Sequence, residues 1–116
     1  MVELRDVVSH LGRSQPAIVA GDFNTDSRES LYSMVAALGI DLTAKARELQ
    51  NSGTTANPRD GRPEWIDYIV AAHSETYTVS ADLELIVNES ADVPYSDHSG
   101  LFCTISFRSK AEAGGR

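Results

Sequence analysis

Apolar residues recur along the chain at two different spacings, which separates expected helices from expected strands. Over residues 2–12 they follow the three- and four-residue spacing of an amphipathic helix, and Gly12 closes the pattern. Residues 17–20 form a short continuous apolar run that ends at Gly21, which is typical of a strand covered on both faces. We therefore expect a helix and then a central strand at the start of the chain.

The next segment has the pattern of a capped helix. Asp26 or Ser27 is placed to cap it, and Glu29 completes a capping box if Asp26 is the cap. Gly39 is well suited to end it. The buried stripe expected on this helix consists of Leu31, Met34, Val35 and Leu38.

The remainder of the chain alternates strand patterns with polar segments. A short helix is expected within residues 41–50, followed by a long loop over 51–64 that contains two glycines and two prolines. A second, mostly polar loop covers 88–100. Strands are predicted over residues 65–70, 77–87 and 101–107. Helices between and beside strands indicate an α/β layered arrangement, with a mixed sheet and flanking helices.

Composition limits the classes of protein that fit this chain. A length of 116 residues with 41% apolar residues favours one folded unit, which we place at residues 1–110, with 111–116 as a frayed tail. No apolar run is long enough for a membrane-spanning helix, and the first residues lack a signal-peptide pattern. The net charge of −7 opposes nonspecific attraction to nucleic-acid phosphates. These features leave the compartment open.

A carboxylate and an amide follow the first expected strand. In the segment Gly21–Asn24, Asp22 and Asn24 are two residues apart, so on an extended chain their side chains face the same way. A carboxylate there can bind a metal or position a water, and an amide can donate to a phosphoryl oxygen. The alternative is a turn in which both side chains bond to the local backbone.

A single aspartate interrupts a strand of aromatic and β-branched residues. Asp67 lies inside the segment Trp65–Val70, where an unpaired buried charge is costly. It therefore needs a cation or a histidine as a partner. The alternative is a solvated aspartate on an edge strand.

The third polar segment precedes the last expected strand. Asp97 and His98 stand side by side there, and a histidine near carboxylates is suited to acid–base chemistry or phosphate stabilisation near neutral pH. His10 and His73 are expected on the surface. The aspartates expected to be caps or turn residues are Asp26, Asp41 and Asp60.

Taken together and in this order, three short segments resemble the C-terminal motifs of the endonuclease/exonuclease/phosphatase superfamily. They are Gly21–Asn24 (GDFN), Ile66–Ile69 (IDYI) and Ser96–His98 (SDH). The resemblance extends from about Pro16 to Phe107. It implies the C-terminal half of a DNase I-like fold, a partial four-layered αββα sandwich.

The resemblance also implies phosphoester hydrolysis by an activated water, with Mg²⁺, Mn²⁺ or a similar divalent ion. Asp22 would align or deprotonate the water, and Asn24 would hold the phosphoryl group. Asp97 would contribute to the metal site, together with Asp22 and Asn24. His98 would contact the scissile phosphate, oriented by a hydrogen bond to Asp67. The resemblance thus supplies the partner that Asp67 needs.

Within the superfamily, the segment Pro63–Ile69, preceded by Thr54 and Thr55, is similar to the sphingomyelinase branch. Nuclease-like branches more often carry an arginine at the position of Trp65. A phospholipid is therefore the expected substrate, ahead of nucleic acid. Arg59 and Arg62 keep the nuclease alternative open because either can serve a phosphate.

The resemblance also has a departure. The family's metal-binding glutamate belongs to an N-terminal half that this sequence does not match, so we expect the chain to act as part of a longer parent and to be inactive alone. One alternative is a non-catalytic remnant or binding module that keeps the motifs without the metal. Another is an exposed sheet that associates with a copy of itself.

Overall fold

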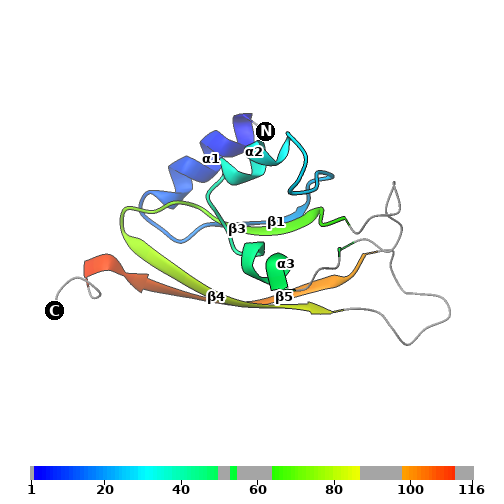
Figure 1. The fold of residues 1–116 in the computed structure, drawn as a ribbon. Helices are drawn as coiled ribbons and strands as arrows, with labels where there is room; N and C mark the ends of the chain where they lie inside the picture. The colour runs from blue at the N-terminus through cyan, green and yellow to red at the C-terminus, as the bar shows by residue number, and fades with distance from the viewer. Residues whose placement is uncertain (1, 50–52, 55–63, 87–97, 112–116) are drawn as a thin grey trace.

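A computed structural model describes residues 2–49, 53–54, 64–86 and 98–111 of the chain (Figure 1). It has a mixed α/β fold with antiparallel sheets and flanking helices, which is compatible with a partial DNase I-like domain. No helix in the described ranges is long and apolar enough to cross a bilayer. The elements, in chain order, are α1 Val2–Gly12, β1 Ile18–Asp22, α2 Tyr32–Ala36, β2 Ile40–Asp41, α3 Ala44–Leu49, β3 Asp67–Ala71, β4 Tyr77–Ile86 and β5 Gly100–Ser109.

The first sheet has β3 at its centre, with β1 and β2 both antiparallel to it. The predicted strands at β1 and β3 are confirmed, but the expectation that β1 is central and covered on both faces is wrong. In the described part of the chain β1 is an edge strand, and Ile18 is 40% exposed. A continuous apolar run specifies a strand, but it does not specify which neighbours the strand finds.

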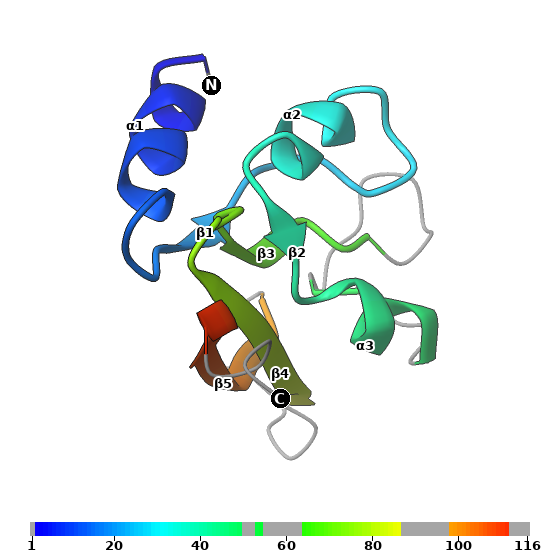
Figure 2. The ribbon, with the colours of Figure 1, turned by 90° about the vertical axis from the view of Figure 1, so that its left-hand side faces the viewer.

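Alternation along the β1–β3 pair assigns its side chains to two faces. Val19 pairs with Val70, and both belong to the face that packs against the buried core. Figures 1 and 2 show α1 and α2 on this side of the sheet and the β4–β5 hairpin on the other side. The core cluster consists of Val35, Leu38, Ala46, Trp65, Tyr68 and Val70.

The second helix is shorter than the apolar stripe predicted. Hydrogen bonds between residues three apart, such as Tyr32 N–H to Glu29 O at 3.1 Å, make tight turns before α2 begins. Within the predicted stripe Val35 and Leu38 are buried, but Leu31 is 59% exposed. The expectation that Asp26 or Ser27 caps this helix is wrong, because Leu31 stands at the N-cap of α2 without a side-chain cap bond, although Glu29 Oε1 does accept the N–H of Asp26 at 2.8 Å. Asp26 and Glu29 therefore close a turn that precedes the helix.

The predicted short helix after β2 is confirmed as α3, and a polar network attaches it to the sheet. The carboxylate of Asp41 accepts hydrogen bonds from Tyr32 Oη at 2.6 Å and from the Arg47 guanidinium at 3.1 Å. Asp41 also accepts the N–H of Thr43 at 2.9 Å, so the expected turn role is confirmed, but its side chain is only 7% exposed and has distant partners that the sequence did not indicate. The Arg47 guanidinium also lies over the rings of Tyr32 and Tyr68.

The last two predicted strands are confirmed as the β4–β5 hairpin. Leu83 pairs with Cys103 on one face, while Asp82 and Glu84 lie on the other face and are exposed. Burial, with a smaller effect of Asp82, raises the pKa of the Cys103 thiol, as expected for an inert cysteine. The mixed sheet expected from the sequence is not found in the described residues, whose strand pairs are all antiparallel.

Candidate carboxylate and histidine site

Two aspartates meet where β1 ends and β3 begins. Asp22 is the last residue of β1, Asp67 is the first of β3, and the two are directly paired in the ladder. Residues that face each other in an antiparallel pair lie on the same side of the sheet, so both carboxylates project from the face opposite Val19. Like charges placed in this way repel each other. The arrangement therefore favours a cation near the pair.

The imidazole of His98 lies between these two carboxylates. Its Nδ1 is 2.7 Å from Oδ2 of Asp67, and its Nε2 is 3.8 Å from Oδ2 of Asp22. The short bond to Asp67 fixes the orientation of the ring and directs Nε2 towards Asp22. The Asp67 side chain is 17% exposed and the Asp22 side chain 39%, so the cluster opens on the Asp22 side. The interpretation of Asp67 as a solvated edge residue is wrong.

Asn24 adopts a backbone conformation that the sequence did not indicate. Its φ of 53° is in the left-handed region, so the chain turns there and does not stay extended. The expectation that Asp22 and Asn24 face the same way on an extended segment is therefore wrong. The backbone N–H of Asn24 donates to Oδ1 of Asp22 at 2.8 Å, as the turn alternative proposed. The Asn24 side chain is exposed next to the cluster.

A buried hydrogen-bond network attaches the loop after Asn24 to the start of β3. Asp26 Oδ2 accepts the backbone N–H of Trp65 at 2.8 Å. The Tyr68 hydroxyl lies 2.6 Å from the Thr25 carbonyl and 2.7 Å from that of Trp65. Asp26 is therefore more than a turn residue, because it connects the two segments that carry the aspartates. The sequence predicted a local capping or turn role for Asp26 and contained no signal for its distant partner Trp65.

The charge state of Asp26 follows from these contacts. Burial favours the neutral carboxyl, but hydrogen bonds from Arg28 and from the Trp65 N–H outweigh burial and lower the pKa of Asp26 below its ordinary value of 3.8. Burial raises the pKa of the Tyr68 hydroxyl. Asp26 therefore accepts as a carboxylate and Tyr68 donates as a neutral phenol at neutral pH.

The described residues include one group of side chains that could hold a metal ion. Asp22, Asp67 and His98 each offer a ligand atom, and these atoms lie within 4.8 Å of one another. The sequence proposed Asp97, Asp22 and Asn24 instead, and Asp97 lies outside the described residues, as does Asp60. Carboxylates suit Mg²⁺ and Mn²⁺, and an imidazole suits Zn²⁺. The donor chemistry therefore fits a divalent ion.

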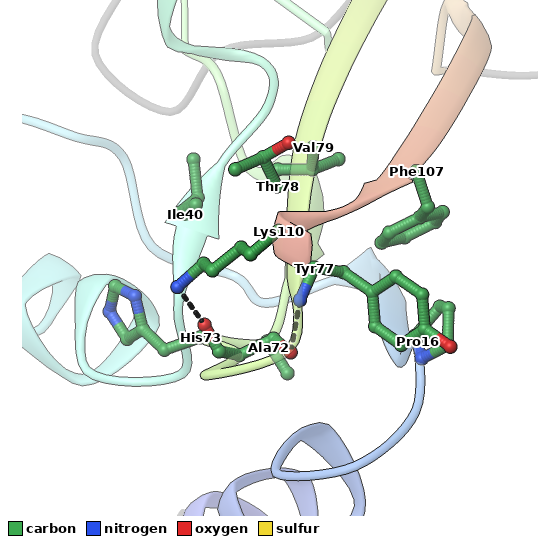
Figure 3. Close-up of a pocket in the computed structure, with 10 residues that line it drawn as sticks. Pro16, Ile40, Ala72, His73, Tyr77, Thr78, Val79, Phe107 and Lys110 are labelled. Carbon is green, nitrogen blue, oxygen red and sulfur yellow. Dashed lines mark hydrogen bonds between the residues drawn. The ribbon is translucent and has the colours of Figure 1, made fainter. Parts of the chain in front are cut away.

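A cavity of about 350 Å³ lies at the other end of β3 (Figure 3). Ala72, His73 and Ser74 line it directly after β3 ends, whereas Asp67 begins that strand. Lys110 Nζ donates to the Ser74 carbonyl at its rim, at 2.7 Å. His73 and His10 are both exposed, as predicted. Its lining includes none of Asp22, Asp67 and His98, so this cavity is separate from the carboxylate and histidine cluster.

Comparisons with known proteins agree with the motif order. The family model described as the endonuclease/exonuclease/phosphatase family matches residues 1–98, a range that includes all three motifs and ends at His98. Neither the curated proteins nor the solved structures give a match to this chain. The family match covers more than half of the sequence, so the chain belongs to the endonuclease/exonuclease/phosphatase family.

Proposed function

We propose that this chain carries the acid–base half of a metal-dependent phosphodiesterase site. Family membership indicates hydrolytic cleavage of a phosphoester in general terms. The observation that carries the finer proposal is the position of His98, hydrogen-bonded to Asp67 on one side and facing Asp22 on the other. An oriented histidine beside a second carboxylate can supply the acid and base groups for water attack on a phosphoester.

Each residue then has a separate role. Asp67 holds the His98 ring, so that in the doubly protonated imidazole Nε2–H donates to a phosphoryl oxygen and stabilises its developing charge. Asp22, the more exposed carboxylate, aligns the attacking water and accepts its proton. Asn24 contributes its amide to the phosphoryl group from the turn that Asp22 stabilises.

A divalent ion completes this proposal. When bound, it would polarise a phosphoryl oxygen and offset the charge of the two opposed carboxylates. We assign it to Asp97, Asp22 and Asn24, with Asp67 adjacent.

We propose a phospholipid as the substrate, of the sphingomyelinase type. Trp65 occupies the position where nuclease-like branches more often carry an arginine, and it is 2% exposed, so it fills the core and contacts no phosphate. The net charge of −7 also disfavours a polyanionic substrate. Arg59 and Arg62, which would support the nuclease alternative, lie outside the described residues.

The test combines turnover with metal binding. A chromogenic phosphodiester is incubated with the chain and Mg²⁺ or Mn²⁺, and the same ions are titrated by calorimetry into wild type and Asp97→Ala. Turnover and specific binding, with binding lost in Asp97→Ala, support the proposal for this chain. If neither signal occurs, the chain is not catalytic by itself, and the alternative of a non-catalytic binding module gains support.

Two variants then test the roles of the residues in an active preparation. Asp22→Ala and His98→Ala are each expected to lower turnover roughly a hundredfold or more. His73→Ala is the matched control, because His73 is exposed at the opposite end of β3. Near-normal turnover in both site variants would contradict the assignment. Turnover of sphingomyelin vesicles is then compared with turnover of single-stranded DNA. Faster cleavage of sphingomyelin supports the sphingomyelinase type, and faster cleavage of DNA supports the nuclease alternative.

A further inference from the structure

Thr54 is a fully buried threonine outside every helix and strand, and it lies between the two segments that carry Asp67 and His98. Its relative exposure is 0%, and both its backbone and its hydroxyl are engaged. Oγ1 accepts the backbone N–H of Ile66 at 3.0 Å and that of Asp67 at 3.3 Å. Sequence patterns predicted no chemical role for Thr54.

The backbone of Thr54 forms two further hydrogen bonds, one of them to the segment that carries His98. Its carbonyl accepts the N–H of Ser99, the residue after His98, at 2.7 Å. Its own N–H donates to the Glu64 carbonyl at 2.7 Å. Thr54 thus connects the backbone at the start of β3 with the segment that carries His98. Asp67 and His98 themselves are 31 positions apart in sequence.

We propose that Thr54 is a positioning residue for the Asp67–His98 pair. Its hydroxyl fixes the backbone of Asp67 and its carbonyl fixes the backbone beside His98, so the two side chains are held at hydrogen-bond distance. When His98 is neutral, a proton on Nδ1 that is donated to Asp67 leaves Nε2 as the acceptor nitrogen facing Asp22. Thr54 therefore sets which tautomer of His98 the site presents. This inference rests on the site described under the proposed function.

A merely structural role predicts a different result. Thr43 is also 0% exposed, and its hydroxyl and its N–H both bond to Asp41, in the network around Arg47 and away from His98. Replacing Thr43 by valine removes a buried hydroxyl of the same type without touching the Asp67–His98 pair. Thr43→Val is therefore the matched control for a general loss of packing or stability.

The experiment measures the imidazole ¹⁵N shifts of the chain, labelled at histidine, in the presence of EDTA at alkaline pH. These shifts report which ring nitrogen carries the proton, and His10 and His73 serve as internal references because both are exposed. In wild type we expect His98 to be protonated at Nδ1. Thr54→Val keeps the shape of the side chain but removes the acceptor, and it is expected to shift His98 towards the Nε2-protonated tautomer. Thr54→Ser and Thr43→Val are expected to match wild type.

Each outcome has a defined meaning. An unchanged His98 tautomer in Thr54→Val overturns the positioning role and leaves the proposed function intact. A wild-type His98 protonated at Nε2 means that its bond to Asp67 is not formed, which overturns the site itself. If Thr54→Val does not fold, Thr54→Ser and Thr54→Ala decide the matter: the proposal requires that alanine shifts the tautomer and serine does not, and equal shifts contradict it.

Discussion

Asp22 and Asp67 stand directly opposite each other on adjacent antiparallel strands, with the His98 ring next to both carboxylates. Opposed like charges destabilise a strand pair by up to about 1 kcal/mol, so a bound cation should stabilise this fold. Two carboxylates in this position are hard to explain by stability alone. The energetic cost of the pair points to a function.

The first prediction concerns the response to metal. Mn²⁺ or Mg²⁺ at about 100 times its dissociation constant is expected to raise the free energy of unfolding of wild type by roughly 2.7 kcal/mol. Asp22→Asn should lose this response, while in EDTA it should be as stable as wild type or slightly more stable, because the repulsion is removed. Urea unfolding of both proteins with and without the ion measures this. An equal response to the ion in Asp22→Asn would show that Asp22 is not a ligand.

The second prediction separates the backbone role of Asn24 from its amide. Its φ of 53° suits glycine and costs an alanine about 1–2 kcal/mol. Asn24→Ala should therefore lower the free energy of unfolding by about that amount, whereas Asn24→Gly should change it little. In an active preparation both variants should lose turnover, roughly a hundredfold, because both lack the amide. Full activity in Asn24→Gly would assign Asn24 a purely conformational role.

The third prediction follows from the lowered pKa of Asp26. A carboxyl whose pKa is lower in the folded state stabilises the fold above its unfolded pKa of about 3.8, and this stabilisation is lost as the pH falls through the lower folded value. Asp26→Asn should be about 1–3 kcal/mol less stable than wild type at pH 7, because the hydrogen bonds from Arg28 and Trp65 are weakened. The difference should shrink below pH 3.8. Thermal unfolding of both proteins across this range measures it, and a constant difference would contradict the assignment.

The fourth prediction concerns the buried ion pair between Arg47 and Asp41. Removing one partner leaves an unpaired buried charge, so Arg47→Met is expected to lower the free energy of unfolding by roughly 3–5 kcal/mol. The double variant Arg47→Met/Asp41→Leu should lose less than the sum of the two single changes. Denaturant unfolding of Arg47→Met, Asp41→Leu and the double variant gives the interaction free energy between the two side chains. Strict additivity would mean that the two side chains do not interact, despite their 3.1 Å contact.

Local patterns in the sequence determined most of the secondary structure. The helix over residues 2–12 and the strands that became β1, β3, β4 and β5 follow from spacing and residue type, because a helix or strand selects side chains at a fixed period. The motif order also identified the family, which the family model confirms. The roles of the five site residues stay predictions. Those residues are Asp22, Asn24, Asp67, Asp97 and His98.

The tertiary structure alone decided how these segments meet. The edge position of β1, the turn at Asn24 and the buried role of Asp41 depend on hydrogen bonds to residues distant in the chain or on a local backbone choice that no period records. The link between Thr54 and the Asp67–His98 pair is of the same kind, since it consists of backbone bonds between separated segments. A sequence period specifies which face of an element is buried, whereas long-range packing selects the partner that each polar group finds.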